Sequence, residues 1–122
     1  MRILIADDHE SFRAMLKSML EKLGSEVVEC RDGREAVQRY SEVAPDWVLM
    51  DIEMPKLDGL SAARQITAIN PHARILMITQ HDDADLRAEA GRAGATGYVR
   101  KDNLQVLPGL LKPPPNRARP SL

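Results

Sequence analysis

The sequence predicts a doubly wound α/β fold, in which a parallel sheet is covered by helices on both faces. Short runs that are apolar throughout, ILIA, WVLM and ILMI, are typical of strands buried on both sides. Between these runs the apolar residues recur every three or four positions, which is the spacing of a helix face. Five strands therefore alternate with helices along the chain, as expected of repeated βαβ units.

The first half of the chain is predicted to hold three strands and two helices. Apolar residues at helical spacing run from Phe12 through Met15, Leu16, Met19 and Leu20 to Leu23, and Gly24 then ends the helix. The pair Asp32-Gly33 forms a turn before the second helix, and Pro45 follows that helix. The predicted strands are 3–6, 26–30 and 47–50, and the predicted helices are 12–23 and 34–43.

The second half is predicted to hold two strands and three helices. Residues 54–59 form a loop, because proline and glycine punctuate them. Asp82 or Asp83 caps the fourth helix. The last helix would bury one leucine face, although Pro108 lies inside it and a proline there kinks or ends a helix. The strands are 74–79 and 97–99; the helices are 60–70, one ending at 93, and 103–111 with Leu104, Leu107, Leu110 and Leu111 inward.

Length and composition favour one domain over residues 1–112, followed by a proline-rich tail at 113–122 that is disordered or extended. No apolar run approaches the roughly 20 residues of a membrane span, so we expect a cytoplasmic protein with no membrane partner. The formal charge of −1, from 17 basic and 18 acidic residues, argues against direct nucleic-acid binding. Cys30, the single cysteine, is expected to be a buried apolar residue.

Polar residues follow four of the predicted strands at the edge where parallel sheets bind ligands. They are Asp7 and Asp8 after the first strand, Asp51 after the third, Thr79 at the fourth and Lys101 beyond the fifth. Three neighbouring carboxylates raise one another's pKa and need a cation. Oxygen ligands without cysteine favour Mg²⁺. The sequence therefore predicts a site that binds Mg²⁺ and phosphate.

Within that site Asp51 is the expected nucleophile, forming an aspartyl phosphate, because it follows the central strand and faces an open loop. Lys101 would supply a positive charge and Thr79 a hydroxyl donor. Simpler interpretations stand beside these. Asp7 or Asp8 alone could cap a helix, and a single lysine is commonly a solvated surface charge.

The segments ILIADDH, VLMDIEMPKLDG, ILMIT and GYVRKD resemble, in order and spacing, the receiver domain of two-component response regulators over residues 1–111. The resemblance implies a flavodoxin-like, five-stranded sheet of order 2-1-3-4-5 flanked by five helices. It implies that Asp51 accepts a phosphoryl group from a sensor histidine kinase or a phosphotransfer protein. It also implies that Asp7, Asp8, Asp51 and the backbone carbonyl of Glu53 hold Mg²⁺.

In that family the residue matching Thr79 turns toward the phosphoryl group, and the one matching Lys101 pairs with it. The aromatic matching Tyr98 swings inward and reports the state on the face formed by the fourth helix, fifth strand and fifth helix. The alternative is a half-buried Tyr98 with its hydroxyl in water. A downstream protein target would read that face, whereas Pro108 argues against the homodimer that some members form through it.

The segments DDHESFR and GYVRKD are most similar to receivers that precede a helix-turn-helix domain, and none follows here. Output is then expected through binding another protein, unless the chain is a fragment. The chain departs from the family at Gln80, where a small residue is usual, and at Asp102, where many members have proline. Gln80, Glu53 and His81 are expected to tune dephosphorylation; Gln80 could block water or orient it.

The sequence also suggests two alternative functions. The sequence Asp51-x-Glu53 resembles the D-x-D of small Mg-dependent aspartate-nucleophile phosphatases, but the chain is short for a cap domain and Glu53 stands where that group has aspartate. A pseudo-receiver that docks partners without phosphate is the other. We expect no enzyme activity beyond self-phosphorylation from a donor and autodephosphorylation.

Overall fold

The computed structural model describes residues 1–81 and 83–113, so the predicted tail lies outside the described residues except for Pro113. Within this part of the chain no helix is both long and apolar enough to cross a bilayer. In chain order the elements are β1 (Arg2–Ala6), α1 (Glu10–Lys22), β2 (Glu26–Cys30), α2 (Gly33–Val43), β3 (Trp47–Asp51), α3 (Gly59–Ile69), β4 (Ile75–Thr79), α4 (Ala84–Arg92), β5 (Gly97–Arg100), the 3-10 turn η1 (Leu104–Val106) and α5 (Leu107–Leu110).

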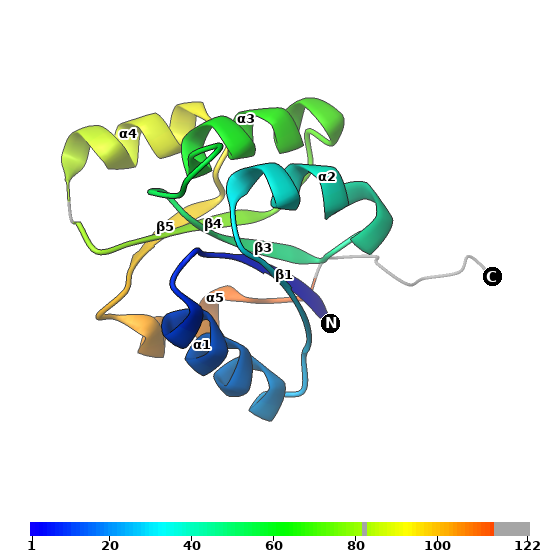
Figure 1. Cartoon of the computed structure of the whole chain (residues 1–122). Helices are drawn as coiled ribbons and strands as arrows, with labels where there is room; N and C mark the ends of the chain where they lie inside the picture. The colour runs from blue at the N-terminus through cyan, green and yellow to red at the C-terminus, as the bar shows by residue number, and fades with distance from the viewer. Residues whose placement is uncertain (82, 114–122) are drawn as a thin grey trace.

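All five strands form one parallel sheet of order β2-β1-β3-β4-β5, which confirms the flavodoxin-like fold. Helices α2, α3 and α4 cover one face, and α1 and α5 cover the other (Figure 1). Asp51 pairs in register with Ile78, so Thr79 lies one residue beyond it on the neighbouring strand. The register thus places the ends of β3 and β4 side by side at one edge.

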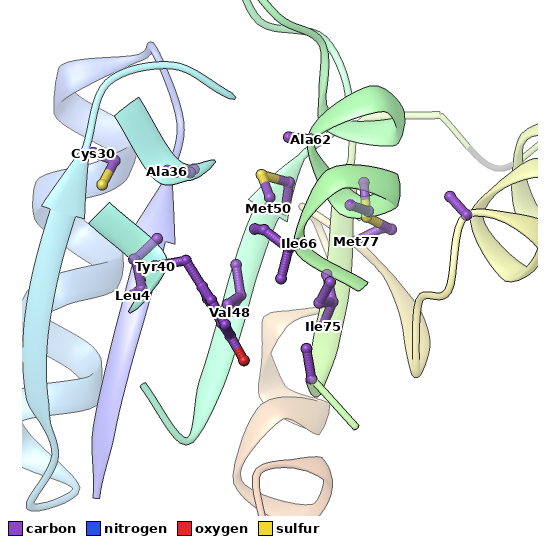
Figure 2. Packing of buried hydrophobic residues seen from close by; sticks show 14 of the residues in the cluster. Leu4, Cys30, Ala36, Tyr40, Val48, Met50, Ala62, Ile66, Ile75 and Met77 are labelled. Atoms are coloured by element: carbon purple, nitrogen blue, oxygen red, sulfur yellow. The ribbon is translucent and has the colours of Figure 1, made fainter. Parts of the chain in front are cut away.

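The core lies on both faces of this sheet, which explains why the strands are apolar throughout. Figure 2 shows Leu4, Val48, Met50, Ile75 and Met77 packed toward α2 and α3. The alternate residues of the same strands pack against α1 and α5 on the other face; they include Ile3, Ile5, Leu49, Leu76 and Ile78. Cys30 is fully buried, as predicted.

The C-terminal helix differs from the prediction. Residues 103–111 do not form one helix; η1 is followed by the four-residue α5, with Pro108 in its first turn. A proline is tolerated there because the first-turn N–H groups have no partner within the helix. Leu107 is buried but Leu110 is exposed, so the prediction that all four leucines face inward is wrong.

The short α5 also leaves part of α1 uncovered. Met15 and Leu23, predicted to face the core, are exposed and form with Pro108 part of an open apolar hollow. Leu16 and Leu20 on the same helix are buried. The buried face of α1 is therefore narrower than the spacing of its apolar residues predicts.

The loop after β3 is held close to Asp51 by glycine. A Cβ at Gly59 would collide with the backbone carbonyl of Asp51, so only glycine permits this approach. The N–H of Gly59 donates to the carbonyl of Ile52, at 2.8 Å. Asp58 then caps α3 by accepting the N–H of Ser61, at 2.9 Å. These contacts fix the loop that borders the candidate site.

The last described residues are fastened at the opposite end of the sheet. The carbonyl of Lys112 accepts hydrogen bonds from Trp47 Nε1, at 2.9 Å, and from Arg74 Nη1, at 3.0 Å. The Arg74 guanidinium stacks on the Trp47 ring, 4.2 Å from its centroid. The described part of the chain therefore ends beside the first residue of β3, at the opposite end of that strand from Asp51.

Candidate functional site

Asp7 and Asp8 lie directly after β1 and differ in surroundings. Asp7 is buried; its Oδ1 accepts the backbone N–H of His9, at 2.8 Å. The side chain of Asp8 is 35% exposed. Helix α1 begins after His9, which is its N-cap residue, so neither acid occupies the cap position. The helix-cap alternative for these acids is wrong.

Lys101 joins two of the carboxylates. Its Nζ lies 3.0 Å from Asp7 Oδ2 and 3.6 Å from Asp51 Oδ2. Only 10% of the lysine side chain is exposed, so the alternative of a solvated surface charge is wrong. The Lys101 backbone N–H donates to the carbonyl of Thr79, at 2.7 Å, which ties the chain after β5 to the end of β4.

Asp51 is buried at the end of β3, and its carboxyl group is strongly perturbed. Burial, and after it the negative charge of the neighbouring Asp7, raise the pKa of Asp51 from 3.8 to about 6. The Lys101 ammonium and the Glu53 backbone N–H act in the opposite direction. The site therefore holds more negative charge than its single lysine balances, as the sequence predicts for three adjacent acids.

The acidic residues are close enough to bind one cation. Asp7, Asp8, His9 and Asp51 each offer a ligand atom, and these atoms lie within 4.8 Å of one another. Carboxylate oxygens are the ligands that Mg²⁺ prefers, and the raised pKa of Asp51 marks a charge that a cation would neutralise. The donor set of this pocket fits Mg²⁺.

Thr79 is buried at the end of β4, and its Oγ1 accepts the N–H of His81, at 3.1 Å. The exposed Gln80 lies between them. His81 Nε2 lies 3.5 Å from Glu53 Oε1, so the loops after β3 and β4 approach each other here. Two exposed residues, Gln80 and His81, directly follow Thr79 in the sequence. The exposed Glu53 follows Asp51 by two positions.

Tyr98 on β5 is half-buried, and its hydroxyl donates to the backbone carbonyl of His81, at 2.8 Å. The guanidinium of Arg87 on α4 lies 4.5 Å from the centroid of its ring. The expectation of a half-buried ring is met, but its hydroxyl is bonded to the protein rather than only to water. The ring is thus fixed between α4 and the loop after β4.

Two residues near the site escaped the sequence analysis. Arg13 on α1 is buried; its Nη1 donates to the carbonyl of Asp7, at 2.7 Å, and its Nε to Glu29, at 2.9 Å. Arg13 shares the three-to-four spacing of Leu16 and Leu20, which was the available signal. His9 lies beside Asp7 and Asp8. The signal for it in the sequence was its position directly after these two acids.

Comparisons with known proteins identify the family and the fold. The family described as "Response regulator receiver domain" matches residues 3–109. The chemotaxis protein CheY of Thermotoga maritima is 42% identical over 101 residues, covering 82% of this chain and 84% of that protein. A LuxR-family two-component response regulator from Aurantimonas sp. SI85-9A1 aligns with a TM-score of 0.83 and 36% identity, covering 90% of this chain and 84% of that one.

A third similar structure is the CheX-CheY-BeF3-Mg²⁺ complex from Borrelia burgdorferi. It aligns with a TM-score of 0.83 and 29% identity, covering 90% of this chain and 86% of that one.

Proposed function

This chain belongs to the response regulator receiver domain family, whose members are signalling proteins rather than classical enzymes, and we propose that Asp51 is its phosphorylation site. The observation that carries the proposal is the position of Asp51, buried at the end of the central strand with Lys101 Nζ 3.6 Å away. A sensor histidine kinase or a phosphotransfer protein would supply the phosphoryl group. Family membership argues against the alternative of a small phosphatase.

Asp51 suits the role of nucleophile better than its neighbours do. Asp7 is engaged by both His9 and Lys101, whereas Asp8 lies outside the central strands. With a pKa of about 6, Asp51 is ionised at neutral pH and so carries the lone pair that attack requires. An Asp51 carboxylate oxygen bonds to phosphorus as the donor's bond to phosphorus breaks. The leaving group keeps that electron pair and takes a proton from solvent.

The cation that this proposal requires is Mg²⁺. Asp7, Asp8, Asp51 and the backbone carbonyl of Glu53 would hold it, and the acidic pocket fits it. When bound, Mg²⁺ neutralises charge on the transferred phosphoryl group. Lys101 contributes a second positive charge beside Asp51 Oδ2. The similar structure from Borrelia burgdorferi, a complex of CheY with CheX, BeF3 and Mg²⁺, supports this assignment.

The phosphorylated state would be read through Thr79 and Tyr98. Thr79 lies beside the end of β3 and would turn its hydroxyl toward the phosphoryl group. Tyr98 would then leave the hydrogen bond that its hydroxyl makes with His81. The surface of α4, β5 and α5 would present the change to a downstream protein target. Because α5 has only four residues, we do not expect a homodimer there.

The test is phosphorylation by a small donor. Wild type incubated with acetyl phosphate and Mg²⁺ should gain one phosphoryl group by intact mass, and Asp51→Asn should gain none. Asp102→Asn is a matched control, since this exposed acid pairs with Arg100 away from the pocket. Undiminished labelling of Asp51→Asn would place the nucleophile elsewhere. Failure of wild type to take up phosphate or bind beryllofluoride would favour the pseudo-receiver.

A further inference from the structure

The imidazole of His9 lies at the acidic pocket, and the side-chain hydrogen bond it makes there is with one of the proposed metal ligands, Asp7. Its Nδ1 lies 3.2 Å from Asp7 Oδ1 and 3.4 Å from Asp8 Oδ1. His9 is the N-cap residue of α1, yet its side chain makes no capping hydrogen bond. The ring is 57% exposed, so burial of apolar surface does not explain its position either.

A second observation concerns Asp7. This carboxylate is almost wholly buried, and apart from the ion pair with Lys101 Nζ, at 3.0 Å, its Oδ2 has no hydrogen-bond partner. Its Oδ1 is held by the backbone N–H of His9. The same residue thus orients a buried carboxylate and brings a ring nitrogen to it. Among the described residues, His9 is the histidine whose ligand atom groups with those of Asp7, Asp8 and Asp51.

We propose that His9 determines the metal preference of this pocket by supplying a nitrogen ligand to borderline divalent ions such as Co²⁺. This inference rests on the cation site of the proposed function. Imidazole favours Co²⁺ and Zn²⁺, whereas Mg²⁺ prefers oxygen. The pocket then binds Mg²⁺ through carboxylates alone and Co²⁺ through carboxylates and His9.

Ligation requires a free lone pair on Nδ1. With Co²⁺ bound, the ring must therefore carry its single proton on Nε2, and the contact of Nδ1 with Asp7 Oδ1 gives way to the metal. The exposure of the ring lets Nε2 face water, so this tautomer needs no protein acceptor. His81 makes a different contact, with Glu53 at 3.5 Å, and does not belong to this group of ligand atoms.

The experiment compares Co²⁺ and Mg²⁺ dissociation constants by titration calorimetry for wild type, His9→Asn and His72→Asn. Asparagine is a favourable N-cap residue, so His9→Asn should keep the fold, which a thermal melt verifies. His72 is exposed outside the site and serves as the matched control. We expect His9→Asn to weaken Co²⁺ binding roughly tenfold or more and to change Mg²⁺ binding less than about twofold. The visible absorption of bound Co²⁺ should change in His9→Asn alone.

Three results would overturn the proposal. An unchanged Co²⁺ constant in His9→Asn, or equal losses for the two ions, would show that His9 is not a ligand. If either result is found while wild type still binds Mg²⁺, the proposed function remains intact. A wild type that binds neither ion would overturn this proposal together with the cation site on which it rests.

Discussion

Replacing Asp51 by asparagine should make the metal-free domain more stable at neutral pH and leave it unchanged near pH 4. Asp51 is buried, and its pKa in the folded protein is raised to about 6, chiefly by loss of hydration and by the neighbouring Asp7. The ionised carboxylate is thus less favourable in the folded chain than in the unfolded one. Asparagine keeps the shape of the side chain and removes the charge.

The rise from 3.8 to about 6 gives the magnitude. At 1.36 kcal/mol for each tenfold change in acid dissociation, it corresponds to about 3 kcal/mol. Because the folded state retains its proton longer, wild-type stability falls as pH rises from about 4 to about 6 and is level above that. For a domain of this size the difference at neutral pH is on the order of 10 °C in melting temperature.

The assay is urea unfolding in EDTA at several pH values between 4 and 8. Acids outside the pocket titrate in both proteins and cancel, so the difference between Asp51→Asn and wild type reports Asp51 together with its coupling to Asp7. That difference should grow from near zero at pH 4 to a plateau above pH 6, whereas Asp102→Asn should show no such trend. A difference independent of pH, or one that grows as pH falls, would refute the reasoning. Added Mg²⁺ should narrow the gap, because a ligand of the folded wild type stabilises it.

Three further predictions follow from the same contacts. Asp8→Ala should weaken Mg²⁺ binding in calorimetry more than Asp7→Ala, because Asp7 is already engaged by His9 and Lys101; equal losses would contradict this. Gln80→Ala should shorten the lifetime of the acyl phosphate, because the larger glutamine side chain obstructs the approach of water; slower decay would contradict this and mean that Gln80 assists hydrolysis. A chain ending at Lys112 should melt within a few degrees of the parent, since Leu111 and the Lys112 carbonyl keep their contacts; a large drop would show that the tail packs.

The strands and most helices could be predicted because their pattern follows from burial alone. A strand covered on both faces must be apolar throughout, and a helix that covers it must repeat apolar residues every three or four positions. Observed and predicted bounds differ by at most two residues for these elements. Once the strands were predicted, the convergence of Asp7, Asp51 and Lys101 could be predicted too, because the carboxyl ends of parallel strands lie at one edge of the sheet.

Other features depend on contacts that spacing does not encode. Whether Met15 faces the core depends on how far α5 extends, and α5 is only four residues long with Pro108 in its first turn. A buried arginine such as Arg13 needs a backbone carbonyl and a carboxylate at the right places, here from Asp7 and Glu29. Those partners are set by the packing of α1 against β1 and β2. No local sequence pattern therefore predicts these hydrogen-bond partners of Arg13.

The loop after β4 shows how such contacts could link the pocket to the surface. His81 donates its backbone N–H to Thr79 Oγ1, at 3.1 Å, and accepts the Tyr98 hydroxyl at its carbonyl, at 2.8 Å. A Thr79 hydroxyl that turned toward a phosphoryl group on Asp51 would give up the first bond. The backbone of His81 would then be freed to move, and with it the acceptor that fixes Tyr98 against α4. One residue of main chain therefore joins the hydroxyl nearest the proposed chemistry to the ring nearest the proposed binding face, and both bonds are weak enough, at about 1 kcal/mol each, to exchange on phosphorylation.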